Sequence, residues 1–146
     1  MEYFLDSNIF VNAKIKDRKY GSSCAKVITD LAEGRLSAAT STLALVEVSK
    51  ALRKIGLGQE VAPEISSIYS TGITVSELVN VDVRLTVELF RSSSVSPYDC
   101  AHAAIMKRIG LDTILSTDPH FEDIPGINRL DPLKYPPRKT QGRTLA

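Results

Sequence analysis

The sequence is poor in the residues and segments that mark secreted, zinc-binding and membrane proteins. It has only two cysteines, Cys24 and Cys100, which lie far apart and form no CxxC or other metal-ligand pattern. This arrangement gives no indication of a zinc site and favours reduced, buried thiols in a cytoplasmic protein. The N-terminal stretch MEYFLDSNIF contains two acids and lacks the basic start and apolar block of a signal peptide. No segment has the uncharged length that a membrane span requires.

An excess of charge of one sign is missing as well. The formal net charge is +1, so no overall basic field points to a polyanionic partner. The sequence also has no internal repeat and no low-complexity block. What it does have is 146 residues with 43% hydrophobic content, which is enough to bury the core of one domain.

Short apolar runs alternate along the chain with longer segments of helical periodicity. The expected strands are residues 3–5, 36–39, 73–75 and 113–117, with a last extended piece near 126–130. The expected helices are residues 22–33, 42–55, 59–70, 82–92 and 97–109. Alternation of this kind predicts an α/β fold, with a central parallel sheet covered on both faces in a three-layer α/β/α sandwich.

Four acids fall where such a fold gathers functional groups. Asp6 and Asp118 each follow an expected strand, and ligands of open parallel sheets bind at the carboxyl ends of the strands. Glu47 lies at the edge of the apolar face of its helix, and Asp99 lies in the first turn of a later helix. If the first and fourth strands are neighbours, the four carboxylates meet and require a cation among them. Oxygen ligands favour Mg²⁺ or Mn²⁺.

Each acid also has an ordinary structural explanation. Asp6 can cap the turn that follows it, and Glu47 can form a surface ion pair with Lys50. Asp99 can complete a capping box with Ser96. Asp118 can belong to an Asp-Pro turn. No single position is therefore specific, and the functional interpretation depends on the four occurring together and in order.

Four segments carry that order, namely LDSN, STLALVEVSKAL, SPYDCAHAAIM and ILSTDPHF. Together they resemble the PIN-domain nucleases, with the closest likeness to the VapC-type toxins of prokaryotic toxin–antitoxin pairs. The resemblance covers roughly residues 3–131. It implies that the catalytic, metal-holding acids are Asp6, Glu47, Asp99 and Asp118, the last within a Thr/Ser-Asp-x-x-Phe pattern. It further implies supporting roles for Ser7, Asn8, Thr117 and Asp123.

The function implied by the resemblance is metal-dependent hydrolysis of RNA. A bound Mg²⁺ or Mn²⁺ activates water for attack on a phosphodiester, and the family reaction leaves a 5′-phosphate and a 3′-hydroxyl. The implied partners are RNA, a second copy of the chain in a homodimer and a cognate antitoxin. The implied organisation is a PIN-like nuclease domain over residues 1–131. Residues 132–146 hold four basic residues and no acid, so they are expected to form a mobile, basic tail.

Two further features have a functional and an ordinary interpretation. The segment KIKDRK supplies four cations, Lys14, Lys16, Arg18 and Lys19, which are candidate contacts to the RNA phosphates. The alternative is a solvated loop. His102 follows Asp99 by about one helical turn and can approach a substrate phosphate, although a lone histidine on a helix is more often structural.

Other functions remain open at this stage. A receiver-like or phosphatase domain also gathers acids at strand ends, but LDSN lacks the second acid two residues on, and the usual lysine after a late strand is absent. The remaining alternatives are an RNA-processing PIN nuclease without an antitoxin, and a non-catalytic RNA-binding protein on a PIN scaffold. Metal-dependent RNA cleavage separates a nuclease from the receiver-like and non-catalytic alternatives, and a neighbouring gene for a DNA-binding antitoxin favours the toxin over a processing nuclease.

Overall fold

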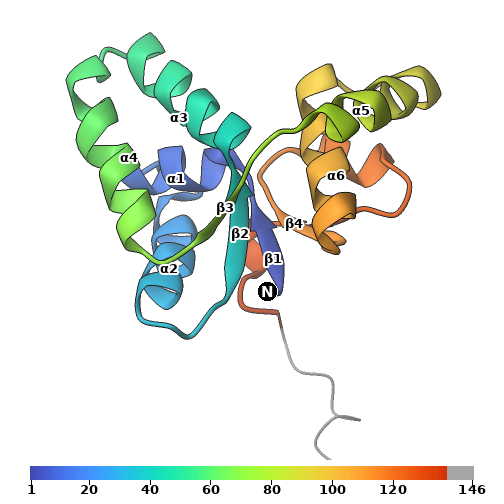
Figure 1. Cartoon of the computed structure of the whole chain (residues 1–146). Coiled ribbons are helices and arrows are strands. Elements are labelled where there is room, and N and C mark those ends of the chain that lie inside the picture. Colours follow the sequence, from blue (N-terminus) through green and yellow to red (C-terminus); the bar gives the residue numbers. More distant parts are fainter. Residues whose placement is uncertain (138–146) are drawn as a thin grey trace, which may run out of the picture.

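The computed structural model describes residues 1–137 and contains five strands and six α-helices in this range (Figure 1). The strands are β1 (Tyr3–Leu5), β2 (Ala38–Ser41), β3 (Thr74–Ser76), β4 (Thr113–Leu115) and β5 (Asn128–Leu130). The helices are α1 (Ser7–Lys14), α2 (Gly21–Ala32), α3 (Thr42–Lys54), α4 (Val61–Ser70), α5 (Asn80–Ser92) and α6 (Pro97–Ile109).

The strands form one parallel sheet in the order β3-β2-β1-β4-β5. Strands β1 and β4 are neighbours, with Phe4 opposite Ile114 and Leu5 opposite Leu115. The sheet is built outward in both directions from this pair, so the strand order reverses there. In open α/β sheets the ligand site lies at such a reversal, beyond the carboxyl ends of the strands.

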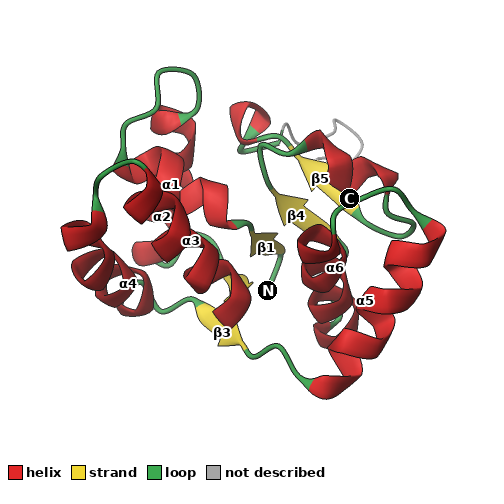
Figure 2. Ribbon diagram, turned by 90° about the horizontal axis from the view of Figure 1, so that it is seen from above, coloured by secondary structure: helices red, strands yellow, loops and turns green. Residues whose placement is uncertain are grey.

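Helices cover both faces of the sheet, and the predicted three-layer α/β/α sandwich is confirmed (Figures 1 and 2). Adjacent strand residues point to opposite faces, so β1 sends Phe4 into one core and Leu5 into the other. The first core packs under α5 and α6 and includes Met106. The second packs under α1 to α4 and includes Leu52. The edge of the sheet between these two cores is where helices from both layers approach each other.

Two helix starts show how local sequence places the later site residues. Helix α1 was not among the expected elements, and it begins at Asp6, whose carboxylate accepts a hydrogen bond from the Ser7 N–H. Helix α3 begins one residue later than Ser41, whose hydroxyl accepts from the Ala44 N–H at 3.0 Å. Asp6 directly follows β1 and Ser41 is the last residue of β2, so each strand passes straight into a helix at the same edge of the sheet.

The ordered chain continues past the predicted domain boundary at residue 131. Residues Pro132–Lys134 form a 3₁₀ turn, and the Tyr135 hydroxyl donates to the Asp30 carboxylate on α2 at 2.7 Å. Hydrogen bonds from Lys26 and Tyr135 lower the pKa of Asp30 to about 2. The remainder of the predicted basic tail, residues 138–146, lies outside the described residues. None of the helices in the described range is both long and apolar enough for a membrane span.

A buried ion pair holds α5 against α6, and its loss should be measurable. Asp82 accepts from the Arg108 Nε at 2.8 Å and from the Val79 N–H at 2.9 Å. We expect Asp82→Ala to lower the free energy of unfolding by about 2 kcal/mol, less than for a fully buried pair because Arg108 is partly exposed. Urea denaturation at pH 7 measures the change, with Asp112→Asn, an exposed acid, as the control.

The same pair should show a defined pH dependence. Burial by itself raises the pKa of Asp82, but the hydrogen bonds from Arg108 and Val79 outweigh it and lower the pKa. The contribution of this ion pair to the free energy of unfolding is therefore complete above the ordinary pKa of an aspartate. It is lost as the pH falls below that value and through the lowered pKa of Asp82. The difference between wild type and Asp82→Ala should shrink from pH 7 to pH 3. An unchanged difference would show that the carboxylate charge does not contribute.

Candidate metal centre at the carboxyl edge of the sheet

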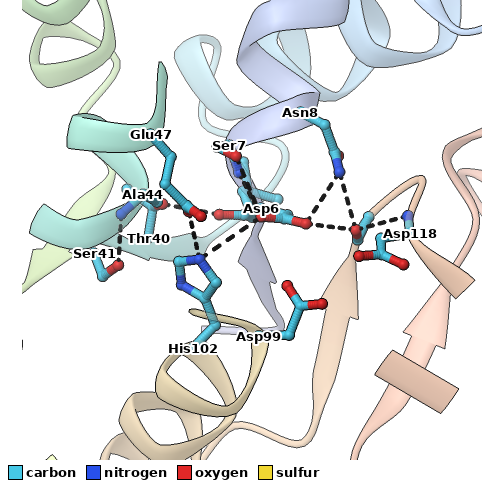
Figure 3. Close-up of polar contacts among 12 residues, drawn as sticks. Asp6, Ser7, Asn8, Thr40, Ser41, Ala44, Glu47, Asp99, His102 and Asp118 are labelled. Atoms are coloured by element: carbon cyan, nitrogen blue, oxygen red, sulfur yellow. Dashed lines mark hydrogen bonds and ion pairs between the residues drawn. The ribbon is translucent and has the colours of Figure 1, made fainter. Parts of the chain in front are cut away.

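Asp6 is the most constrained residue of the candidate site. It directly follows β1, its exposed fraction is 5%, and both of its carboxylate oxygens are held (Figure 3). Oδ1 accepts from the Ser7 N–H at 2.8 Å, while Oδ2 accepts from Asn8 Nδ2 at 3.0 Å and from the Ser116 hydroxyl at 2.6 Å. Burial raises the pKa of Asp6 despite these hydrogen bonds. The fold thus holds the Asp6 carboxylate in one orientation at a buried position where its ionised form is disfavoured.

Ser116 connects β1 to β4 and was not identified from the sequence. Its hydroxyl donates to Asp6 and accepts from the Asp118 N–H at 3.0 Å. Asn8 links the same strands, because its Oδ1 accepts from the Thr117 N–H at 3.2 Å. Thr117, expected to support the site, contacts Asn8 through its backbone. The signal in the sequence was the position of Ser116 directly after the apolar part of the strand.

Glu47 reaches the site from α3 and bonds to His102, not to Lys50. The distance from His102 Nε2 to Glu47 Oε1 is 2.5 Å, and the distance from the same nitrogen to Asp6 Oδ1 is 3.9 Å. His102 is completely buried. Burial acts to lower the pKa of His102, but the hydrogen bond to Glu47 and the charges of the nearby acids outweigh it and raise the pKa. This histidine therefore belongs to the acidic cluster and not only to the hydrophobic core.

Asp99 lies in the first turn of α6, as expected, but its carboxylate does not complete the capping box with Ser96. The Ser96 hydroxyl accepts from the Asp99 N–H at 3.2 Å and so caps α6. The Asp99 carboxylate makes no hydrogen bond to the Ser96 N–H, so the capping box is incomplete, and the side chain instead points towards the other acids (Figure 3). Burial, followed by the proximity of Asp118 and Asp6, raises the pKa of Asp99 to about 7.

Asp118 forms the expected turn and also faces Asp99. Its Oδ1 accepts from the His120 N–H at 2.9 Å, which fixes the carboxylate at the end of β4. The exposed ring of His120 adds a second contact to this oxygen, also at 2.9 Å. Asp123, predicted to supplement the cluster, is exposed at the end of the same 3₁₀ turn and has no hydrogen bond or ion pair to the other acids within the described chain.

The site therefore consists of two adjoining groups of candidate ligands. The first group is Asp6, Glu47 and His102, and the second is Asp99, Asp118 and His120; within each group the ligand atoms lie within 4.8 Å of one another. The raised pKa values of Asp6 and Asp99 show that these carboxylates resist ionisation when no cation neutralises them. Carboxylate oxygens crowded in this way fit Mg²⁺ or Mn²⁺.

The four cations proposed to bind phosphate, Lys14, Lys16, Arg18 and Lys19, lie away from this centre. Lys14 is the last residue of α1 and the other three follow it in the chain, whereas Asp6 caps the start of this helix, about 12 Å from Lys14 along its axis. Lys14 forms an exposed ion pair with Glu60 at 3.4 Å. The cations closer to the cluster are on α3. There Lys50 and Lys54, together with Glu47 and the exposed Tyr98, line a pocket of about 350 Å³.

Comparisons with known proteins identify the family and support the fold. The model of the PIN domain family matches residues 3–127. No curated protein matches the chain. The chain is similar in fold to VapBC2 of Rickettsia felis, bound to a DNA fragment from the promoter, with 19% identity, a TM-score of 0.68 and coverage of 90% of this chain and 100% of that one. VapC20 of Mycobacterium tuberculosis, a toxin that cleaves the sarcin-ricin loop, has 15% identity, a TM-score of 0.70 and coverage of 83% and 93%. DNA-bound VapBC of Salmonella typhimurium has 19% identity, a TM-score of 0.68 and coverage of 90% and 98%.

Proposed function

Because the chain belongs to the PIN domain family, we propose that it is a Mg²⁺- or Mn²⁺-dependent endoribonuclease that hydrolyses RNA phosphodiester bonds. The observation that carries the proposal is the convergence of four carboxylates from separate elements, Asp6, Glu47, Asp99 and Asp118, at the reversal point of the sheet. Four carboxylates gathered in this way repel one another unless a cation lies among them. A bound metal ion that neutralises these carboxylates is therefore the simplest explanation of the geometry.

The proposed mechanism assigns a separate task to each set of residues. Asp6, Glu47, Asp99 and Asp118 hold the metal ion, and they do not attack the substrate. The ion, when bound, supplies an activated water nucleophile and stabilises the departing oxygen. Ser116 and Asn8 hold the Asp6 carboxylate in a fixed orientation, so little rearrangement is needed on binding.

We further propose that the protein is the toxin of a toxin–antitoxin pair and that it acts as a homodimer in the cytoplasm. The structural similarity to VapBC complexes supports an antitoxin partner. Helix α5 supports a dimer, because Val83, Val87 and Phe90, spaced i, i+4 and i+7, are exposed along one of its sides. Light scattering of the purified protein should give the mass of a dimer, and a monomer at micromolar concentration would contradict that part of the proposal.

The function is tested with purified protein and single-stranded RNA. We expect cleavage with Mg²⁺ or Mn²⁺ and none in EDTA, because the acids cannot activate water by themselves at neutral pH. Undiminished cleavage in EDTA, by protein free of contaminating nuclease, would exclude a metal-dependent enzyme. Binding without cleavage would indicate the non-catalytic alternative. The product of the adjacent gene can also be co-expressed with the protein. If RNA cleavage is then unchanged, the protein is a processing nuclease without an antitoxin.

Two groups of basic residues are candidates for the RNA contact, and salt dependence separates them. Lys50 and Lys54 line a pocket together with Glu47. We therefore expect the double variant Lys50→Ala/Lys54→Ala to make the negative slope of log affinity against log salt shallower by about 1.4. The matched variant Lys16→Ala/Lys19→Ala removes the same charge farther from the acids. If the second variant makes the slope shallower and the first does not, the 14–19 segment is the phosphate contact.

A further inference from the structure

His102 is a buried titratable group in the centre of the acidic cluster, and the proposed mechanism gives it no task. Its ring packs near the rings of Phe4 and Phe121, at centroid distances of 5.7 and 6.4 Å. Nε2 contacts Glu47, whereas Nδ1 is buried and has no hydrogen-bond partner within the described chain. The two ring nitrogens thus have opposite surroundings, and this asymmetry limits what the imidazole can do.

The hydrogen-bond partners determine which nitrogen carries the proton. A carboxylate of Glu47 is only an acceptor, so the short contact requires a hydrogen on Nε2. The opposite tautomer would set the lone pair of Nε2 against the carboxylate and would also leave the Nδ1 N–H buried without an acceptor. Both the neutral Nε2–H form and the imidazolium carry the required hydrogen on Nε2, although only the neutral form avoids a buried Nδ1 N–H without an acceptor. The donation therefore does not depend on the charge of the ring.

A positioning histidine and a metal-ligating histidine carry the ring hydrogen on different nitrogens. If Nε2 bound an ion, the ring hydrogen would move to Nδ1, and metal-ligating histidines usually donate that hydrogen to a carboxylate, carbonyl or water. Nδ1 of His102 is buried and has no such acceptor within the described chain. Although its nitrogen lies within ligand distance of Asp6 and Glu47, the ring lacks the second contact that a ligand requires.

We infer that His102 is a positioning residue, which donates its Nε2–H to Glu47 and holds that carboxylate towards Asp6, and that it is not a metal ligand. This inference rests on the proposed metal-dependent function. Glu47 belongs to α3, which packs on one face of the sheet, and His102 belongs to α6 on the other face. Without the bond, the partly exposed Glu47 side chain is free to turn towards Lys50, one turn along α3. The hydrogen bond from His102 thus holds the Glu47 carboxylate in place by linking α6 on one face of the sheet to α3 on the other.

The test is Mn²⁺ binding by RNA-free protein, followed by electron paramagnetic resonance of the free ion. We expect His102→Leu to weaken binding by about tenfold or more, as other changes behind a metal ligand do. His102→Gln keeps an N–H donor at a similar reach and should restore most of the affinity. On a Glu47→Ala background, His102→Leu should cause no further loss, because no carboxylate remains to be oriented. A further loss there, with no rescue by glutamine, would identify His102 as a ligand.

Two controls keep the inference separate from folding and from the proposed function. If His102→Leu only lowers the melting temperature and leaves Mn²⁺ affinity unchanged, the residue is merely structural and the inference is wrong. If the leucine variant does not fold, nitrogen-15 spectra of wild-type histidine decide, since Nε2 should remain protonated with and without Mg²⁺, and a shift of the proton to Nδ1 would overturn the inference. If Asp6→Asn binds Mn²⁺ as wild type does, the proposed metal site itself fails.

Discussion

Asp6→Asn should lower RNA cleavage by more than about a hundredfold, because changes even behind a metal ligand cost about 10–100-fold. Asp6 is the acid at the centre of the site, 5% exposed and held by hydrogen bonds to Ser7, Asn8 and Ser116. An asparagine keeps the shape but replaces one fixed oxygen with an N–H donor, which cannot bind a cation. Initial rates of cleavage of one RNA at saturating Mg²⁺ measure the effect.

The control for this variant is Asp112→Asn, which removes an exposed carboxylate remote from the cluster and should cleave as wild type does. The gain in melting temperature on adding Mg²⁺ gives a second readout, since it reports binding to the folded state alone. Asp6→Asn should lose most of that gain. If Asp6→Asn cleaves RNA at a near-normal rate, the reaction does not take place at this site, whether or not the site binds metal.

The sheet, and the position of Asp6 and Asp118 after strands, were predictable from the sequence because both depend on local signals. Apolar runs mark β1 and β4, and Asp6 and Asp118 each follow a strand end. Helix α1 was missed because SNIFVNAK mixes β-branched and asparagine residues of weak helix propensity, and its strongest signal is the cap at Asp6. The predicted boundary at 131 likewise came from composition, which does not reveal the Tyr135 contact to α2.

The contacts that the sequence could not predict all join residues from distant parts of the chain. Ser116 meets Asp6 only because β4 pairs with β1, and His102 meets Glu47 only because helices from opposite layers approach at that edge. A serine at a strand end or a histidine on a helix is common, so neither type alone indicates such a role. Topology, not the local pattern, decides which side chains share a site.

Asp99→Asn should have opposite effects on the metal-free and the metal-bound protein. Burial and the neighbouring acids Asp118 and Asp6 raise the pKa of Asp99 to about 7. A raised carboxyl pKa means that the folded state retains the proton longer than the unfolded state. Metal-free wild-type protein therefore loses stability as the pH rises from about 4 to about 7. Asp99→Asn should remove this loss, so that without metal the variant melts at the wild-type temperature or higher at pH 8.

With Mg²⁺ the order should reverse, because the ionised carboxylate that destabilises the metal-free fold is what a cation requires. Melting curves at pH 5 and pH 8, with and without Mg²⁺, measure both effects. Wild type should gain most from the ion at pH 8, whereas Asp99→Asn should show a much smaller gain and cleave RNA slower by orders of magnitude. A helix cap alone would behave differently. If Asp99→Asn melts lower without metal, keeps the full Mg²⁺ gain and still cleaves RNA, the carboxylate serves only α6, and the metal must be held by Asp6, Glu47 and Asp118 without it.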